Sequence, residues 1–500
     1  MTKSQQSLYN ILVVLFVTLG SITYGYSSSI IGTTLGQPSF IRYFNLQSSS
    51  RSAAITGAIN GLYQAGGVLG TLSTTLLADR SGRRKTMFCG AFCVVVGGAL
   101  QAGSVHIAMF LVARLLTGLG IGNLVTIVPL WQGEVAPPAT RGFLVGLHGV
   151  FILCGYTLAS WMGVAFYFVQ AAGAQWRIPL AIQIFPPLIL LCGVITVPES
   201  PRWLVQQGQE DRALAVLLRL HESGNQENHG SYAQHELDQI KGQFEVDKLS
   251  PTSWASIFSV PSYRKRAIIG FATMFLAQCT GTQIINNYGP SLYASMGFDS
   301  KRQLLITAGW ISVGVVANYG NALLLDRVGR VRLLVFGLAG CAVALLLEAI
   351  MLAKYQGSNN RGGIGAAVFF LFLHIIFYGS CVDATTYVYA TEIWPTHIRS
   401  KGSALATTGL FTSSLILQTV SPTAFEGIQW RYYMVFMSLS LAGAAAFWQW
   451  WPETKGLPLE KIGELFNDEV VTILGYEEQV LTGEQQVVED KVGRQHRISE

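Results

Sequence analysis

The chain has 500 residues, of which 50% are hydrophobic and only 12% are charged, and its formal net charge is +5. A soluble domain carries about 25% charged residues, so most of this chain lacks the charged surface that a soluble globular protein needs. The small net charge gives no reason to expect a nucleic-acid partner. The seven cysteines lie in apolar runs with no spacing typical of a zinc site, which indicates small buried residues rather than disulfides. We therefore expect an integral membrane protein without a metal or other cofactor.

Twelve apolar runs are long enough to cross about 30 Å of hydrocarbon, which takes about 20 helical residues. They are rich in Gly, Ala, Ser and Thr, as close helix packing in lipid favours. The first run is longer than the apolar part of a signal peptide and has no small-residue cleavage site, so we expect it to be retained. The sequence predicts an all-α membrane protein with twelve transmembrane helices, at approximately 8–33, 53–77, 86–105, 107–131, 142–168, 176–197, 266–294, 303–325, 331–353, 364–391, 401–424 and 430–451.

A charged segment at 198–263 interrupts these runs and predicts short amphipathic helices on one side of the membrane. We expect four parts: a six-helix half at 1–197, this linker, a second six-helix half at 264–452, and a polar tail at 453–500. Positive-inside logic puts the most basic loops, and with them the linker, the tail and both termini, in the cytosol. The basic residues of these loops are Arg80, Arg83, Arg84, Lys85, Arg264, Lys265, Arg266, Arg327, Arg330, Arg332, Arg399 and Lys401.

Three short motifs occur twice, in the same order and at nearly the same offset. DRSGRR at 79–84 returns as DRVGRV at 326–331, and PESPR at 198–202 is echoed by PETKG at 452–456. The frame E-x-x-P-x-x-x-R occurs at 134–141 and again at 392–399. A single copy of any one motif would be weak evidence, but three pairs in order indicate two pseudo-symmetric halves, with a substrate site at their midplane interface.

Together with ARLLTGLGIG at 113–122 and the P-x-x-x-x-E-x-x-P-x-x-x-R-G frame at 129–142, these motifs give the chain a specific likeness. It resembles the sugar porter family of the major facilitator superfamily, most of all its fungal members, from the first span to 462. The resemblance implies the major facilitator fold and secondary transport of a sugar or sugar-like solute, such as a monosaccharide or a sugar acid, by alternating access.

No metal cluster, nucleophile elbow or phosphate loop occurs, so an enzyme is not expected. One alternative is a major facilitator transporter of a non-sugar metabolite. Another is a nutrient sensor on the same fold, which fits less well because sensors that resemble this family carry a long cytosolic tail, and only 44 residues follow Gly456.

The repeated charges lie at the inner ends of the spans in both halves. Carboxylates and guanidinium groups at close range form bidentate pairs, which would lock the cytosolic side in one state of the transport cycle and release it in the other. The alternative is that they only anchor the topology at a solvated face; the two matched sets, and the resemblance, favour a gating network. Its expected members are Asp79, Arg83, Glu134 and Arg141, and in the second half Asp326, Arg330, Glu392 and Arg399.

Glu199, Arg202 and Glu453 are expected to join this network. Val331 replaces the last Arg of the first-half motif, so the second half is expected to pair less fully.

Polar side chains inside two apolar spans are the candidates for substrate binding. Gln278, Gln283 and Asn287 are amides in span seven, and the last two share one helix face. Asp383 and Tyr387 share a face of span ten. A carboxylate facing lipid would cost about 2.5 kcal/mol or more, so Asp383 should face the protein interior. There it either binds substrate hydroxyls or has a structural role; the amides likewise either line a cavity or join helices.

The resemblance adds Phe411, which takes the position of a family Trp, to these candidates. It also reveals departures, because Asp383 and Tyr387 replace a Gly and a Trp, and Gly149 stands where the family has a sugar-binding Gln. Much of the usual hexose-binding set is altered, so glucose itself is not the expected substrate.

Proton-coupled family members carry an Asp in span one that faces an Arg of span four. Here Ser27 stands at the Asp position while Arg114 is kept. Three alternatives follow: a uniporter, a symporter in which Asp383 or His148 carries the proton, or a carrier in which Arg114 meets an anionic substrate. The expected partners are thus a sugar-like solute, protons in the second alternative, and the lipid bilayer, with the plasma membrane as the expected location.

Overall fold

The computed structural model describes residues 8–46, 52–135, 141–169, 171, 173–221, 229–247, 252–358, 360–395, 397–455 and 459–466. The chain forms two compact units, Met1–Gly456 and Leu457–Glu500. Every regular element in the described residues is a helix. In the second unit this is α22 (Leu459–Leu465), and the other described helices belong to the first unit.

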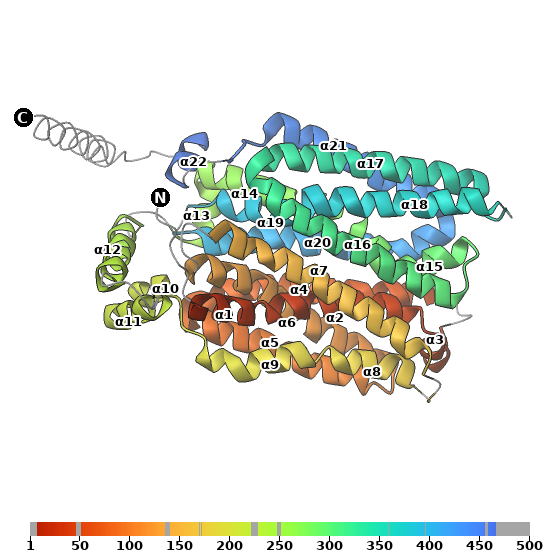
Figure 1. Ribbon diagram of the computed structural model, residues 1–500, viewed down its shortest axis with the longest axis horizontal. Coiled ribbons are helices and arrows are strands. Elements are labelled where there is room, and N and C mark those ends of the chain that lie inside the picture. Colours follow the sequence, from red (N-terminus) through yellow and green to blue (C-terminus); the bar gives the residue numbers. More distant parts are fainter. Residues whose placement is uncertain are drawn as a thin grey trace, which may run out of the picture. The chain divides into compact units, whose positions relative to one another are not determined.

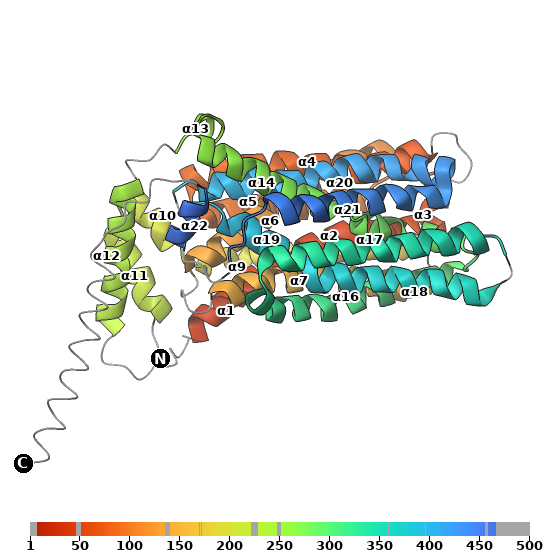
Figure 2. The ribbon, with the colours of Figure 1, turned by 90° about the horizontal axis from the view of Figure 1, so that it is seen from above.

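The helices before the linker form what we call the first helix group. Long helices of this group lie side by side with those that follow the linker (Figures 1 and 2). Its elements are α1 (Leu8–Val17), α2 (Leu19–Leu35), α3 (Pro38–Tyr43), α4 (Ser52–Ser81), α5 (Arg83–Ala102), α6 (Ile107–Val135), α7 (Arg141–Tyr167), α8 (Ala174–Ile182), α9 (Phe185–Gly193) and the short η1 (Val194–Thr196).

The helices after the linker form the second helix group. Its elements are α14 (Pro261–Gln278), α15 (Thr282–Ser295), α16 (Ser300–Val328), α17 (Arg330–Tyr355), α18 (Arg361–Phe377), η2 (Tyr378–Val382), α19 (Asp383–Glu392), α20 (Arg399–Ile428), η3 (Gln429–Arg431) and α21 (Tyr432–Trp450).

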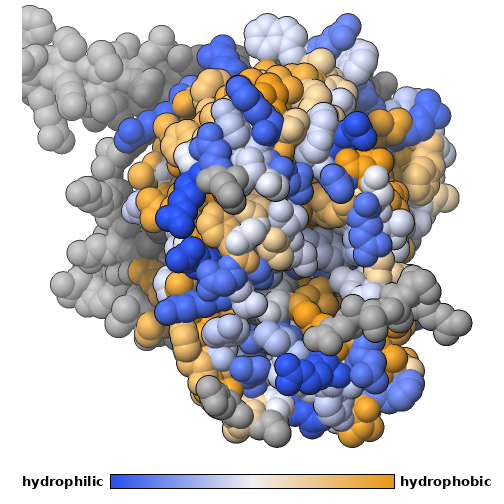
Figure 3. All heavy atoms as spheres, turned by 90° about the vertical axis from the view of Figure 1, so that its right-hand side faces the viewer, coloured by the Kyte–Doolittle hydropathy of each residue, from blue (hydrophilic) through white to orange (hydrophobic). Residues whose placement is uncertain are grey.

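Four short helices occupy the linker, and all lie at one end of the unit, which we call the linker end (Figures 1 and 2). They are α10 (Pro201–Gln206), α11 (Glu210–His221), α12 (His229–Asp247) and α13 (Trp254–Ser259). Leu217 of α11 and Leu237 of α12 are buried in one apolar cluster, so these helices pack through one apolar face, as amphipathic helices do. Figure 3 shows the opposite end, where hydrophilic side chains are interspersed with hydrophobic ones.

In the described residues, nine helical segments are long and apolar enough to cross a membrane by length and composition alone. The long helices α4, α20 and α21 are not among them. For α4 and α20 the packing gives the reason, because their small and polar residues face each other. A Cβ at Gly57 would lie 2.4 Å from the Thr419 carbonyl oxygen, and one at Gly61 would lie 2.3 Å from the Thr419 hydroxyl. Small residues thus let the two groups approach at backbone distance.

Several predicted spans are not single regular helices. Span seven breaks into α14 and α15 at Gly281, whose φ of +77° suits glycine because it has no Cβ. Span ten contains the π-helical turn η2 before α19. Span six breaks before Pro186 and Pro187 at the start of α9, since proline cannot donate a backbone hydrogen bond. The break in span seven places Gln278 at the end of one helix and Gln283 at the start of the next.

Candidate functional site

The start of α5 is held by two acidic residues at the linker end. The Glu199 carboxylate accepts hydrogen bonds from the backbone N–H groups of Arg83 (2.9 Å) and Arg84 (3.2 Å), where the helix dipole favours an anion. The Arg83 side chain forms two hydrogen bonds with the Glu134 carboxylate, at 2.9 and 2.8 Å. Gly82 precedes the helix with φ +86°, and a Cβ there would lie 2.5 Å from a Glu199 oxygen. The glycine of the repeated motif therefore makes room for the capping carboxylate.

The start of α17 repeats this arrangement. Glu453 accepts hydrogen bonds from the backbone of Arg330 (2.8 Å) and Val331 (3.0 Å), and the Arg330 side chain bonds the Glu392 carboxylate at 3.1 and 3.0 Å. Gly329 has φ +111°, and a Cβ there would lie 2.8 Å from a Glu453 oxygen. Val331 makes this contact through its backbone, but its side chain has no donor to repeat the contact of Arg84 with the Ile195 carbonyl; that the second half pairs less fully stays a prediction.

The other expected members of the network also make contacts at the linker end, and Asp79 interacts electrostatically with Arg83 and Glu134. Asp79 lies 3.7 Å from the ammonium of Lys401, which joins the two helix groups at the linker end. The Arg399 guanidinium donates to the Trp394 carbonyl. Arg141 is the first residue of α7, but its side chain lies outside the described residues.

The Asp326 side chain also lies outside the described residues, although its backbone belongs to α16. For Arg141 and Asp326 the gating role stays a prediction.

An enclosed pocket lies between the two helix groups. Its volume of about 20 Å³ has room for one or two water molecules, so a larger solute requires its walls to move apart. The first group contributes α7 residues, and the second group contributes residues of α14 to α19. The lining residues are Ile152, Leu153, Tyr156, Gln278, Thr282, Gln283, Asn286, Ile311, Ile375, Tyr378, Asp383 and Tyr387.

The predicted amides Gln278 and Gln283 both line this pocket. Gln283 donates a hydrogen bond of 2.5 Å to the Tyr156 hydroxyl, from the second group to the first, and Gln278 donates one of 3.3 Å to the Tyr378 hydroxyl. The side-chain oxygens of both glutamines are buried and have no hydrogen-bond partner. A pocket with unused acceptors can receive hydroxyl donors from a solute.

Asp383 and Tyr387 also line the pocket. The Asp383 carboxylate accepts a hydrogen bond from the Asn318 amide and interacts with the Tyr378 hydroxyl. No ion pair with Asp383 is present in the described part of the chain. Asp383 begins α19, yet no side-chain hydrogen bond caps that helix. A structural role for Asp383 would therefore rest on its contact with Asn318 of the neighbouring helix α16 and not on capping α19.

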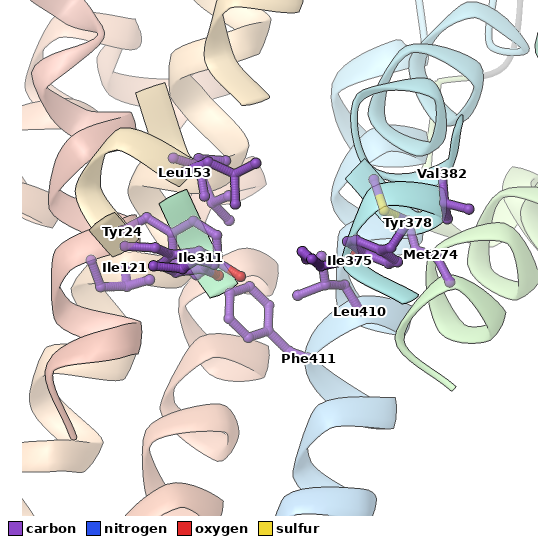
Figure 4. Packing of buried hydrophobic residues seen from close by; sticks show 14 of the residues in the cluster. Tyr24, Ile121, Leu153, Met274, Ile311, Ile375, Tyr378, Val382, Leu410 and Phe411 are labelled. Carbon is purple, nitrogen blue, oxygen red and sulfur yellow. The ribbon is translucent and has the colours of Figure 1, made fainter. Parts of the chain in front are cut away.

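Asn287 and Phe411 lie beside the pocket and are not among its lining residues. Asn287 donates to the Gln418 side chain at 2.8 Å, while its neighbour Asn286 faces the pocket. Phe411 packs edge-on against Tyr24, with ring centroids 6.3 Å apart, and Figure 4 shows its ring reaching from α20 into the space between the groups.

Sequence reasoning missed Tyr156, Tyr378 and Asn286. Asn286 lies beside a residue that was singled out, so the amide cluster NN was a usable signal. The two tyrosines stand in apolar runs without a motif, and only the fold brings them to the pocket.

The remaining candidates for coupling differ in their distance from the pocket. The Arg114 guanidinium donates to the carbonyls of Ile59 and Ser27 and lies 4.1 Å above the ring of Tyr63; it does not line the pocket. His148 is buried, its Nδ1 lies 2.7 Å from the Ser21 hydroxyl, and its ring meets that of Tyr387 edge-on at 5.6 Å. His148 is therefore one side chain away from the pocket.

Comparison with known proteins decides the family. The family described as "Sugar (and other) transporter" matches residues 13–466, which is nearly the whole chain. The chain belongs to this family. Among similar proteins, the MFS-type transporter criB of Aspergillus cristatus is 34% identical over 90% of this chain and 92% of its own.

Two further relatives of this transporter have more specific names. A quinate permease of Neurospora africana is 29% identical over 90% of this chain and 87% of its own. High-affinity glucose transporter 1 of Candida albicans is 25% identical over 93% of this chain and 87% of its own.

The solved structure of the proton:xylose symporter XylE, bound to 6-bromo-6-deoxy-D-glucose, superposes with a TM-score of 0.80. It covers 92% of this chain and all of that chain, at 21% identity. The likeness confirms the predicted major facilitator fold and, with the apolar helices, a multi-pass membrane protein. The transporter's pocket thus lies between two groups of helices whose linker ends are held by matched charge clusters.

Proposed function

We propose that this protein transports a neutral, hydroxyl-rich solute of the size of a monosaccharide or cyclic polyol by alternating access. In this proposal Asp383 is the principal residue that binds the solute. The observation that carries the proposal is the lining of the interface pocket, where one carboxylate and two amide acceptors face aromatic side chains. Hydroxyl groups donate to such acceptors, and apolar ring faces pack on tyrosine side chains. The names of the glucose and quinate relatives fit a compact polyhydroxylated ring; glucose is neutral, whereas quinate also carries a carboxylate.

The charge of the pocket favours a neutral solute over an anionic one. The carboxylate of Asp383 is the charged group among the lining residues, and none of these residues is a cation. Arg114, the candidate for binding an anion, is held by two backbone carbonyls and by the face of Tyr63. While Asp383 is ionised, an acidic solute would meet like charge there, which is costly at low dielectric.

Solute entry requires the hydrogen bond between Gln283 and Tyr156 to open, because it joins the two helix groups across the pocket. The Arg83–Glu134 and Arg330–Glu392 pairs each hold helices within one group. We propose that they keep each group rigid while the pairs between groups, such as Asp79 with Lys401, form and break. The side chains of Arg141 and Asp326 belong to this gating proposal by their place in the repeat.

For coupling, we propose that Asp383 takes up the transported proton, with His148 as the alternative carrier next to Tyr387. Protonation of Asp383 would remove a charge that has no cationic partner in the pocket. The proposed location is the plasma membrane, with the linker end and both termini in the cytosol, as the basic loops indicate.

The test is uptake into proteoliposomes from a panel of radiolabelled monosaccharides, cyclic polyols and their carboxylated analogues. Each is measured at pH 5 and pH 7, with and without a protonophore. We expect saturable uptake of a neutral member, with accumulation that the protonophore abolishes. Uptake confined to carboxylated solutes would overturn the proposal for the substrate.

Asp383→Asn separates the two roles of this residue. The variant keeps the shape of the side chain and the contact with Asn318 but loses the charge. We expect weaker solute binding and loss of accumulation, while exchange of solute across the membrane persists. An Asn variant with unchanged affinity and unchanged accumulation would remove both roles from Asp383, and the matched His148→Gln variant then tests the alternative carrier.

A further inference from the structure

A second carboxyl group lies inside the second helix group, away from the pocket. Glu348 of α17 has no exposed surface and stands in the apolar stretch AVALLLEAIML. Its neighbours one turn away on the same helix, Ala344 and Leu352, are buried too, so the carboxyl group points into the protein. An ionisable residue within a membrane span is costly and commonly functional.

The groups around Glu348 are hydroxyls. Tyr433 of α21 and Tyr293 of α15 both interact electrostatically with its carboxyl group. Among the described residues, neither carboxyl oxygen and neither hydroxyl has a hydrogen-bond partner within bonding geometry. The Tyr433 hydroxyl is nevertheless close enough to the Glu348 carboxyl group for a hydrogen-bonding interaction, so a buried carboxyl group and two hydroxyls form one polar cluster.

Charged and titratable groups on the other packed elements face elsewhere. His374 of α18 lies beside Cys341, two turns away along α17. Arg431 of η3 is exposed, with its guanidinium 5.4 Å from the ring of Trp430, and Lys354 lies near the ring of Tyr355 at the end of α17. In the described residues Glu348 thus has no cation beside it, and an ionised carboxylate there would be uncompensated.

The helix α15 connects this cluster to the transport pocket. Gln283 and Asn286, near its start, line the pocket, and Tyr293, near its end, interacts electrostatically with Glu348. Gly281, with its positive φ, separates α15 from α14. A displacement of α15 at Tyr293 would therefore act on the helix that carries the pocket amides.

We propose that Glu348 is a second protonatable site of this transporter and a positioning residue: through Tyr293 its carboxyl group sets the placement of α15. In the neutral form the carboxyl group donates to one hydroxyl and accepts from the other, whereas in the ionised form it accepts from both. Because the two forms bond the hydroxyls differently, they favour different placements of Tyr293 and of α15. Proton binding at Glu348 thus shifts the equilibrium between the two placements of α15.

The first test is infrared difference spectroscopy of the purified protein in lipid nanodiscs during an acid–base titration. The expected result is a band of a protonated carboxyl group that changes with pH, is lost in Glu348→Gln and is shifted in Tyr433→Phe. Tyr26→Phe is the matched control, because Tyr26 is also a buried tyrosine but bonds the Pro179 carbonyl; it should leave the band unchanged. A wild-type spectrum in which no carboxyl band depends on Glu348 overturns the proposal.

The second test measures the pH profile of apparent solute affinity and rests on the proposed transport function. Glu348→Gln mimics the neutral form, so its affinity should stay at the wild-type acid value at every pH. Tyr293→Phe should flatten the same profile, whereas Tyr26→Phe should retain it. A Glu348→Gln variant with the full wild-type pH profile overturns the proposal.

The two tests fail separately. If no solute of the panel is transported, the proposed function fails while the infrared band still decides whether Glu348 titrates. If Glu348→Gln does not fold, Tyr433→Phe and Tyr293→Phe each remove one hydroxyl from the cluster and must shift the band for the proposal to stand.

Discussion

The two helix groups are built alike at the linker end and differently around the pocket. Glu199 caps α5 with contacts of 2.9 and 3.2 Å, and Glu453 caps α17 with contacts of 2.8 and 3.0 Å. A neighbouring contact is repeated as well. Trp131 donates to the Pro198 carbonyl at 3.1 Å, and its counterpart Tyr389 donates to the Pro452 carbonyl at 3.0 Å.

Around the pocket this correspondence ends. The first group contributes Tyr156 and two aliphatic residues of α7, while the second group contributes the carboxylate and all the amides. The repeat therefore preserves the carboxylates that cap helix ends, because both groups need these helix ends to be held in place. Solute recognition needs no such symmetry, and here it comes almost entirely from one group.

The largest effect is expected from removing the arginine of the first charge cluster. In Arg83→Ala the Glu134 carboxylate, only 12% exposed, is left without its partner, which costs about 3–5 kcal/mol for a buried pair. We expect a large fall in the thermal stability of the purified transporter and loss of uptake.

The counterpart variant Arg330→Ala is expected to lose less stability than Arg83→Ala. Glu392 is 26% exposed and also accepts a hydrogen bond from Thr454 at 3.1 Å, so we expect a smaller loss of about 1–3 kcal/mol. Equal losses in the two variants would show that exposure does not distinguish the copies. Normal uptake by either well-expressed variant would reduce that cluster to a topology anchor.

The glycines of the two motifs are expected to have the next largest effect, and an equal one. Gly82→Ala and Gly329→Ala each place a Cβ within 3 Å of the capping carboxylate in a backbone region that suits glycine, at a cost of about 1–3 kcal/mol. Both should lower the melting temperature by similar amounts. The exposed Gly208→Ala, where φ is +70° and no atom lies near the added Cβ, is the control for backbone strain alone. If the melting temperature falls no more than in the control, the capping carboxylate moves away from the added Cβ at little cost.

The charge clusters and the twelve-helix plan were predictable because both rest on local pattern. Apolar length indicates most of the spans directly, although α4, α20 and α21 are less apolar. The repeated frames of Arg83 and Glu134 predict a pair because the family fold brings them together. The capping by Glu199 was less visible, since its partners are backbone N–H groups that no residue type marks. For the same reason the replacement of an Arg by Val331 leaves the cap intact, because the contact with Glu453 is made by the main chain.

The pocket was predictable only in part. Gln283 and Asn287 share a helix face, as their spacing requires, but the two turns of α15 meet different neighbours, so that Asn287 faces Gln418 and Gln283 faces the pocket. Tyr156 could not be chosen from the sequence, because nothing local separates it from other aromatic residues in apolar spans. Which of several inward residues reaches a cavity is decided by tertiary packing.

A third pair of variants tests this distinction inside α15. Gln283→Ala removes a pocket amide and the contact with Tyr156, and we expect apparent affinity to fall about tenfold, equivalent to about 1.4 kcal/mol. Asn287→Ala should leave affinity nearly unchanged and lower thermal stability instead, since Gln418 loses its partner. The measurement is the apparent KM of uptake beside the melting temperature; the opposite assignment of the two effects would place Asn287 rather than Gln283 in the binding site.

The smallest effect is expected where the two copies of the motif differ. Arg84→Val gives the first copy the residue of the second. The backbone N–H of residue 84 can still bond Glu199, as that of Val331 bonds Glu453. What is lost is the contact of the Arg84 side chain with the Ile195 carbonyl, at an exposed site. Exposed substitutions of this kind change stability by about 0.5 kcal/mol or less, so uptake and melting temperature should stay close to wild type.

Glu199→Gln is the matched control for this variant, because it weakens the cap itself. It replaces the charge at the start of α5 and one of two acceptor oxygens by a donor, which faces the N–H of residue 83 or 84. We expect it to destabilise the transporter clearly more than Arg84→Val does. If Arg84→Val instead abolished uptake while Glu199→Gln was tolerated, the side chain of Arg84 would carry the function of the motif. The two helix groups would then differ at the linker end as much as they do around the pocket.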